Sequence, residues 1–277
     1  MDITLFIQQS LQEDIGQGDF TTLSTIDKEQ NGKAKLLVKE EGVLAGIELA
    51  KLIFHEVDSS LNFQKQLNDS DKIVVGDVAF TVEGKIQSIL IAERLVLNCM
   101  QRMSGIATIT NELVQILLPF GIKILDTRKT TPLNRNIEKW AVRIGGGFNH
   151  RFGLYDMILI KDNHVDSAGG IKNALIKAQR YVQENNLAVP IEIETRNMVE
   201  IEEAVSTCIP NRIMLDNFKP IAIKEAINLI NGQCEIEVSG GITKDNLLEY
   251  AIKGIDYISM GALTHSVKSL DLSLKIK

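Results

Sequence analysis

The chain has 277 residues, of which 44% are hydrophobic and 24% are charged, and its formal net charge is −6 at pH 7. This is an ordinary globular composition, and the length suffices for one large domain or two unequal ones. A general surface for nucleic acid or anionic membranes would require a basic excess, which this acidic chain lacks. Any anionic ligand must therefore meet a local cluster of basic residues.

The N-terminus and the apolar stretches do not indicate secretion or membrane insertion. Residues 1–20 lack the basic n-region of a secretory signal. The apolar stretch 43–54 is interrupted by Glu48 and Lys51, and it falls well short of the ~20 residues that a membrane span requires. The three cysteines, at positions 99, 208 and 234, lack metal-finger spacing. We therefore expect a cytoplasmic protein whose cysteines are reduced core thiols.

The first hundred residues predict a small mixed domain. Helical periodicity covers 3–13 and 47–56, and strand-like alternation covers 32–39 and 72–82. A longer helical pattern follows over 88–118, and Gly105 is expected to break it into two helices. We place the domain junction there, with an N-terminal domain over 1–105 and a catalytic domain over 106–265.

From residue 122 onward the pattern alternates between short apolar strands and amphipathic helices, which predicts parallel β/α architecture. A closed eight-stranded barrel usually needs about 250 residues, more than this part of the chain provides. We therefore predict the α/β class with an open barrel of six to seven parallel strands. An open doubly wound sheet is the alternative, although no dinucleotide fingerprint or Walker loop is present. The six strands are expected at 123–129, 157–163, 191–197, 212–218, 235–241 and 257–263.

Charged and small polar residues end the predicted strands, and in a β/α barrel these ends meet at one face. The window 128–161 holds seven Lys or Arg against two acids, with its basic groups expected on two strand ends and the loops between them. A polyanionic small molecule bearing phosphate or carboxylate groups is the natural partner. The strand-end residues are Arg128, Lys129, Lys161, Asp162, Glu194, Asp216 and Ser239.

Two glycine-bearing turns and two acids complete the candidate site. Ser239-Gly240-Gly241 precedes a helix expected near Thr243, and Met260-Gly261-Ala262 ends the last strand, so backbone N–H groups and helix dipoles could face a phosphate. Glu194 and Asp216 suit ribose hydroxyls and Mg²⁺. A salt bridge from either acid to Lys161 or to the arginines is an equally good interpretation of each taken alone.

Longer motifs give the chain a family resemblance that runs in order over nearly its whole length. The sequence resembles the quinolinate phosphoribosyltransferase family. The motifs that carry the resemblance are Glu13-Asp-Ile-Gly-Gln-Gly-Asp19, Leu97-Asn-Cys-Met-Gln-Arg-Met-Ser-Gly-Ile-Ala-Thr108, Asp126-Thr-Arg-Lys-Thr-Thr-Pro132, Gly145-Gly-Gly-Phe-Asn-His-Arg-Phe-Gly-Leu154, Ile158-Leu-Ile-Lys-Asp-Asn-His164, Leu215-Asp-Asn217, Ser239-Gly-Gly241 and Gly261-Ala-Leu-Thr-His-Ser266. Two positions depart from the family pattern: Leu133 replaces an expected glycine, and Phe148 replaces a histidine or another polar residue.

The resemblance implies an N-terminal α/β sandwich, an open barrel and a tail, 266–277, that packs back on the first domain. It also implies a homodimer in which Arg102 enters the partner's site. Lys129, Lys161, Glu194 and Asp216 would be catalytic, the two acids with Mg²⁺ and no organic cofactor. The remaining substrate-binding residues implied by the motifs are Thr127, Arg128, His150, Arg151, Ser239, Gly240, Gly241, Met260, Gly261, Ala262 and His265.

The reaction implied by the resemblance joins quinolinate to phosphoribosyl pyrophosphate, releasing pyrophosphate and carbon dioxide to give nicotinate mononucleotide for NAD biosynthesis. Three alternatives are open at this point. The chain could be a molybdenum-associated relative acting on another base. It could be a lyase using Lys161 as a Schiff-base lysine. It could also be a binding or sensing protein that keeps the pocket without turnover.

Overall fold

The computed structural model describes residues 2–276, which divide into two compact units. Of these residues, the first unit comprises 2–111, 130–146 and 263–276, and the second comprises 112–129 and 147–262. The two units alternate along the chain, so the segment that follows the first barrel strand returns to the N-terminal unit before the barrel continues.

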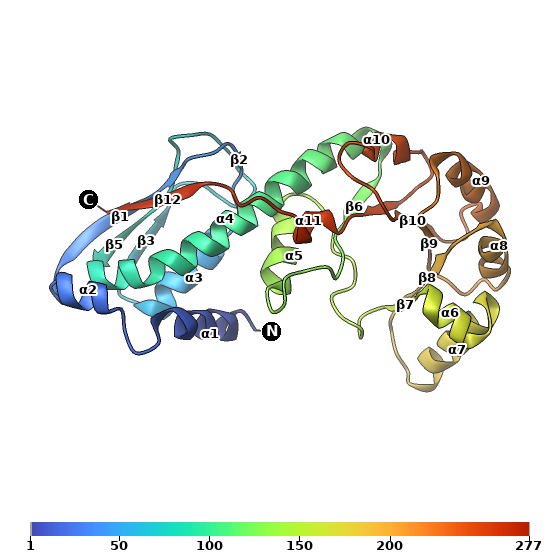
Figure 1. The fold of residues 1–277 in the computed structure, drawn as a ribbon, viewed down its shortest axis with the longest axis horizontal. Helices are drawn as coiled ribbons and strands as arrows, with labels where there is room; N and C mark the ends of the chain where they lie inside the picture. The colour runs from blue at the N-terminus through green and yellow to red at the C-terminus, as the bar shows by residue number, and fades with distance from the viewer. Residues whose placement is uncertain (1, 277) are drawn as a thin grey trace. The chain divides into compact units, whose positions relative to one another are not determined.

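The N-terminal unit is built on a four-stranded antiparallel sheet of order β12-β1-β5-β3 (Figure 1). The C-terminal strand β12 is an edge strand, and its Leu274 pairs with Leu36 of β1. The apolar sides of α3 and β5 meet in a core around Phe54 and Phe80, whose rings pack edge to face at 5.8 Å. The elements that lie wholly or mostly in this unit are α1 (Ile3–Ile15), α2 (Phe20–Thr25), β1 (Asn31–Val38), β2 (Gly42–Val43), α3 (Ile47–Val57), β3 (Asn62–Lys65), β4 (Lys72–Ile73), β5 (Val78–Lys85), α4 (Ile86–Leu117), α5 (Arg135–Ile144), α11 (Ala262–His265) and β12 (Leu272–Ile276).

Two expectations for this unit were wrong. The strand predicted over 72–82 is two strands, β4 and β5, because Gly76 takes a left-handed φ of 102° and turns the chain between them. The predicted break at Gly105 does not occur, since α4 runs without interruption from Ile86 to Leu117. Gly105 is there for close packing: a Cβ on it would lie 2.2 Å from the carbonyl oxygen of Lys268.

This contact makes Gly105 a stability determinant. Gly105→Ala should lower the free energy of unfolding by about 1–3 kcal/mol through overpacking, even though alanine favours a helix by about 1 kcal/mol. Urea denaturation measures the change, with the exposed Asn98 of the same helix, replaced by alanine, as a control expected within about 0.5 kcal/mol of wild type. A stabilised Gly105→Ala protein would show that the segment around Lys268 can move to make room for the added methyl group.

The second unit is an open barrel of six parallel strands in the order β6-β11-β10-β9-β8-β7. From β7 to β11 the strands are neighbours in chain order, and β6 lies beside β11, so the sheet lacks the reversal of order that marks a doubly wound sheet. In Figure 1 the helices between β7 and β10 lie on the outer side of the strands. Its elements are η1 (Leu118–Phe120), β6 (Lys123–Leu125), β7 (Ile158–Ile160), α6 (Asp162–Ala168), α7 (Ile171–Glu184), β8 (Ile191–Thr195), α8 (Met198–Ser206), β9 (Arg212–Asp216), α9 (Pro220–Ile230), β10 (Glu235–Ser239), α10 (Leu247–Tyr250) and β11 (Tyr257–Ser259).

All six predicted barrel strands are present, although each is shorter than expected. β6 ends at Leu125 instead of residue 129, so Arg128 and Lys129 lie in the following turn, whereas Glu194 and Asp216 lie within their strands. The barrel opens between β6 and β7. Phe148 partly occupies the free edge of β6, where its N–H donates to the Ile124 carbonyl at 2.9 Å and its carbonyl accepts from Asp126 at 3.1 Å.

Other sequence expectations meet mixed outcomes. Cys99 is buried, but Cys208 is exposed and Cys234 is half-buried, so the expectation of three core thiols was wrong for Cys208.

Leu133 has a φ of 67°, a left-handed conformation that explains why glycine is expected there. Within residues 2–276, we find no helix that combines the length and the apolarity needed to cross a bilayer.

Candidate active site

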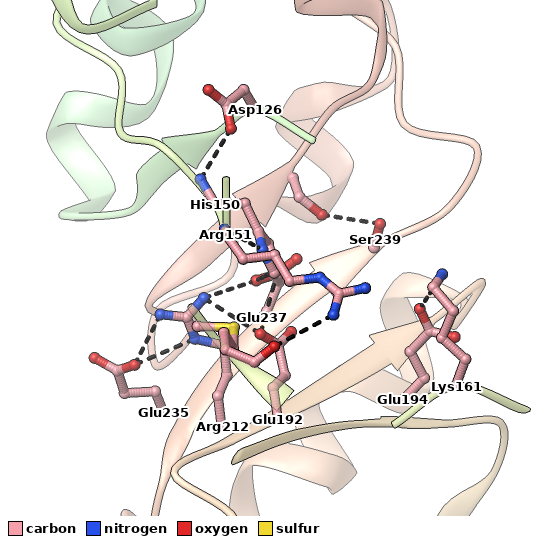
Figure 2. Close-up of polar contacts among 12 residues, drawn as sticks. Asp126, His150, Arg151, Lys161, Glu192, Glu194, Arg212, Glu235, Glu237 and Ser239 are labelled. Carbon is pink, nitrogen blue, oxygen red and sulfur yellow. Dashed lines mark hydrogen bonds and ion pairs between the residues drawn. The ribbon is translucent and has the colours of Figure 1, made fainter. Parts of the chain in front are cut away.

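The polar strand ends of the barrel unit meet as parallel topology requires. Glu194 and Asp216 stand on the neighbouring strands β8 and β9, and Lys161 directly follows β7. The Lys161 ammonium donates to Glu194 at 2.9 Å, and both are drawn in Figure 2. This ion pair is one of the two interpretations left open for Glu194. The contact engages the Lys161 ammonium with a carboxylate, so this geometry gives no support to the Schiff-base alternative.

A glycine turn follows β10 and packs tightly on the end of β9. Asn217 has a φ of 57° and donates from its backbone to the Ser239 carbonyl at 2.9 Å. A Cβ on Gly240 would lie 2.3 Å from the Asn217 side-chain oxygen, whereas one on Gly241 would meet nothing within 4 Å. Gly240 is therefore required for packing, and the backbone of Gly241 borders open space. The Ser239 hydroxyl bonds to that of Ser259 at 2.9 Å.

The helices expected after these turns begin later or are shorter than predicted. No helix begins at Thr243: α10 starts at Leu247 and has four residues, and α11, which follows Gly261, also has four. The intervening residues form turns, with the Thr243 N–H donating to the Asn246 side chain at 2.7 Å. Any phosphate held here would depend on backbone N–H groups of the turns, including Gly261 and Ala262, rather than on a long helix.

A cationic pair lies in the loops that follow β6 and precede β7. The Nε of Arg128 is buried and has no hydrogen-bond partner among the described residues. Arg151 is only 9% exposed and donates to the Met157 carbonyl at 3.3 Å. Burial lowers the pKa of Arg151, and the neighbouring charge of Arg128 lowers it further. Two guanidinium groups that repel each other, one with an orphaned donor, favour an anionic ligand between them.

Two neighbouring residues of the same loop have different surroundings. Lys129 is exposed, and its backbone N–H donates to the Thr127 hydroxyl at 3.0 Å. Thr127 therefore shapes the turn that carries Arg128 and Lys129.

His150 faces the barrel interior. Its Nδ1 accepts from the Arg151 N–H at 2.7 Å, and its Nε2 lies 3.2 Å from Glu192 and 3.5 Å from Glu237. Its own backbone N–H donates to the Asp126 carboxylate at 2.9 Å (Figure 2). Nδ1 thus accepts a hydrogen bond while Nε2 faces two carboxylates, and the ring supports the backbone of Arg151.

Sequence analysis missed the residues around His150. Glu192, Arg212 and Glu237 come from three adjacent strands, where the Arg212 guanidinium lies 3.0 Å from Glu237 and 3.7 Å from Glu192. Burial raises the pKa of Glu192 and of Glu237 to about 7 in each case. The signal was present as charged residues at alternate positions of short buried strands, which place them on the interior face.

Three basic residues of the window 128–161 lie elsewhere. Arg135, Lys139 and Arg143 are on helix α5, in the N-terminal unit, spaced four residues apart on one face. Lys139 is almost fully buried. The expectation that the window's basic groups all lie on strand ends and loops was therefore wrong for these three.

The remaining candidates belong to the N-terminal unit. Arg102 on α4 pairs with the buried Glu138 of α5 at 2.6 Å. His265 ends α11, and its Nδ1 lies 2.6 Å from the Ser266 hydroxyl. Met260, in the barrel unit, is buried and donates to the Leu125 carbonyl at 3.0 Å, linking β11 to β6.

An open parallel barrel whose strand ends bear paired guanidinium groups, a lysine, two carboxylates and glycine turns defines a β/α-barrel enzyme for an anionic, phosphate-bearing ligand. Comparison with known proteins agrees with this class and narrows it. Residues 19–104 match the family described as Quinolinate phosphoribosyl transferase, N-terminal domain, and residues 106–275 match its C-terminal domain. The chain belongs to the quinolinate phosphoribosyltransferase family.

Individual relatives match over almost the full length. The chain is 47% identical to decarboxylating quinolinate phosphoribosyltransferase 1b of Nicotiana tabacum, covering 99% of this chain and 82% of that protein. It is 44% identical to a probable nicotinate-nucleotide pyrophosphorylase of Bacillus subtilis, covering 95% of this chain and 90% of that protein. The crystal structure of NadC from Streptococcus pyogenes has a TM-score of 0.94 at 39% identity, covering 99% of this chain and 96% of that one.

Proposed function

We propose that the chain catalyses phosphoribosyl transfer from phosphoribosyl pyrophosphate to quinolinate with decarboxylation, giving nicotinate mononucleotide, pyrophosphate and carbon dioxide. It would serve the de novo synthesis of NAD. The observation that carries the proposal is the cationic pair of Arg128 and Arg151, which lacks an anionic counterpart at the orphaned Arg128 Nε. The two adjacent carboxylates of quinolinate match a paired guanidinium site in charge.

The chemistry proceeds without a covalent enzyme intermediate. The pyridine nitrogen forms a bond to the sugar C1 as the bond from C1 to pyrophosphate breaks, through a transition state with oxocarbenium character. Arg128 and Arg151 would orient the dicarboxylate, while Lys129 and Lys161 would balance phosphate charge. Positioning and fixed charges would supply most of the acceleration.

Decarboxylation follows from the charge created in the first step. Once the ring nitrogen is quaternary, the electron pair left at C2 by departing carbon dioxide is stabilised by the adjacent positive nitrogen. A proton then takes the place of the carboxylate at C2. The 2-carboxylate is consumed and the 3-carboxylate remains, so the enzyme must hold the ring in one orientation.

Glu194 and Asp216 fit a magnesium site that is shared with substrate. They offer carboxylate oxygens from adjacent strands, and Mg²⁺ is commonly held by one or two carboxylates together with substrate phosphates. When bound, the ion would neutralise the charge of the departing pyrophosphate. Asn217 donates to one Asp216 oxygen at 2.9 Å and so orients this carboxylate.

Asp216→Asn tests the acidic pair. The substitution should raise the Mg²⁺ concentration for half-maximal activity roughly 10-fold or more, because one of two carboxylate ligands is lost. Turnover measured against Mg²⁺ at saturating substrates reports the shift. Asp245→Asn is the matched control, since it changes an acid outside the pair. An unchanged Mg²⁺ requirement would assign Asp216 to ribose alone.

We expect a cytoplasmic homodimer in which Arg102 of one subunit completes the site of the other. Sedimentation velocity would report a dimer at the concentrations used for assay, and a fully active monomer would contradict the shared site. Cell fractionation would test the location.

The first experiment is an assay for nicotinate mononucleotide and carbon dioxide with the purified chain, phosphoribosyl pyrophosphate, Mg²⁺ and either quinolinate or nicotinate. Turnover with quinolinate alone is expected, since the 2-carboxylate completes the contacts of the guanidinium pair. Turnover with neither base by a folded protein would contradict the proposed function.

A further inference from the structure

A fully buried carboxylate lies beneath Arg102 in the N-terminal unit. Glu138, on α5, is 0% exposed, and its Oε1 accepts from the Nε and the Nη2 of Arg102 at 2.8 and 2.6 Å. Burying a carboxylate is costly unless a cation and further donors compensate it. The pair must therefore stay together in the folded unit, whatever the ligand state of the barrel.

The second oxygen of Glu138 extends the contact to the loop before α5. Its Oε2 accepts the Thr131 N–H at 3.1 Å, and the Thr131 hydroxyl in turn accepts from Arg102 Nη2 at 3.0 Å. The same Nη2 donates to the Thr264 carbonyl at 2.9 Å. One carboxylate thus holds the guanidinium and a neighbouring loop in a single geometry.

These contacts occupy one edge of the Arg102 guanidinium. Nε and Nη2 have acceptors, whereas Nη1 has no hydrogen-bond partner within residues 2–276. The side chain is 26% exposed and borders a cavity of about 450 Å³ that is also lined by Arg94. A guanidinium with two unused donors on one side and a rigid anchor on the other is prepared for an external anion.

Glu138 lies on helix α5, which packs closely against α4. The end of α5 lies against α4, because a Cβ on Gly145 would lie 2.6 Å from the Ala107 carbonyl, and Asn111 donates to the Gly145 carbonyl at 3.3 Å. Glu138 therefore cannot follow a moving arginine. It sets the position and orientation of Arg102 relative to its own subunit.

We propose that Glu138, assisted by Thr131, is the positioning residue that presents the free edge of Arg102 to the quinolinate carboxylate in the partner's barrel. This rests on the proposed function and on the shared site. Its particular consequence is that Glu138 acts with the subunit that donates Arg102, not with the barrel of its own chain.

Kinetics give the first test. Glu138→Gln keeps the shape and removes the charge, and it should raise the KM for quinolinate about 10- to 100-fold because the arginine loses its fixed position. The KM for phosphoribosyl pyrophosphate should stay near wild type. Glu40→Gln is the control, since Glu40 likewise belongs to an ion pair, with Lys268, but at the surface. Equal increases in both KM values, or none, would overturn the proposal.

Subunit mixing gives the second test. Arg102→Ala and Glu138→Gln are each unfolded, mixed with Lys161→Ala and refolded. In a hybrid dimer, one site then combines the intact barrel of one subunit with the intact Arg102 and Glu138 of the other. Random pairing makes half of the dimers hybrids with one active site each, so about one quarter of wild-type activity is expected. Glu138→Gln mixed with Arg102→Ala should regain no activity, because both changes impair the Arg102–Glu138 pair that each subunit supplies to its partner.

The outcomes separate the inference from the function on which it depends. An inactive wild-type protein would refute the proposed function. Recovery between Arg102→Ala and Lys161→Ala, together with recovery between Glu138→Gln and Arg102→Ala, would overturn the role of Glu138 alone. Should Glu138→Gln fail to fold, Thr131→Ala at the exposed loop replaces it, with a smaller rise in the quinolinate KM and the same pairing pattern required.

Discussion

Arg128→Met should lower kcat/KM for quinolinate by about 100- to 1,000-fold, since removing one partner of a buried charged contact typically costs 2–5 kcal/mol. The ligand-free protein should be no less stable than wild type. In the absence of ligand, Arg128 repels Arg151 and leaves its own Nε without an acceptor. Replacing it with an apolar chain of similar length removes both unfavourable contributions.

Stability and activity must be measured on the same preparations. Urea denaturation without ligand should give a free energy of unfolding equal to wild type or higher by up to about 1 kcal/mol. Arg180→Met, which removes a charge from the exposed face of α7, should leave both quantities unchanged. A strongly destabilised Arg128→Met with normal kcat/KM would assign the arginine to the fold rather than to substrate.

Much of the fold followed from the sequence because the barrel strands are short, apolar and separated by helices. Their order along the chain is also their order in the sheet, apart from β6, so local patterns were sufficient. Gly105 shows where local patterns fail. The residue that justifies a glycine there is Lys268, a contact distant in sequence that no helical periodicity can reveal.

The candidate site residues likewise include some that the sequence could predict and some that it could not. Lys161, Glu194 and Asp216 were predictable because strand ends gather at one face. Arg135, Lys139 and Arg143 could not be assigned from charge alone, since the chain leaves the barrel unit between β6 and β7 and returns. The segment 130–146 joins the N-terminal unit because α5 packs against α4. The only sign of this packing in the sequence is Gly145.

Arg212 should be the most sensitive residue for stability inside the barrel. Its guanidinium lies within 4 Å of Glu192, Glu235 and Glu237, and it stacks on the Tyr257 ring at 4.0 Å. Arg212→Met should lower the free energy of unfolding by about 3–5 kcal/mol at pH 8, because two fully buried carboxylates lose their cation. Adding Glu237→Gln should recover part of the loss, which a double-mutant cycle would report as coupling.

The pH dependence has a definite sign. Burial, followed by repulsion from Glu192, raises the pKa of Glu237 from an ordinary value of 4.5 to about 7. The folded state therefore binds a proton more tightly than the unfolded state. The associated stability is fully present below pH 4.5 and is lost as the pH rises through 7, by a few kcal/mol at most.

Glu237→Gln should therefore flatten the fall in stability between pH 5 and pH 8 relative to wild type. In Arg212→Met the fall should steepen and extend above pH 7, since the cation that lowers both carboxylate pKa values is gone. Urea midpoints at several pH values measure these slopes. Parallel curves for all three proteins would mean that the interior carboxylates do not titrate in this pH range in the folded barrel.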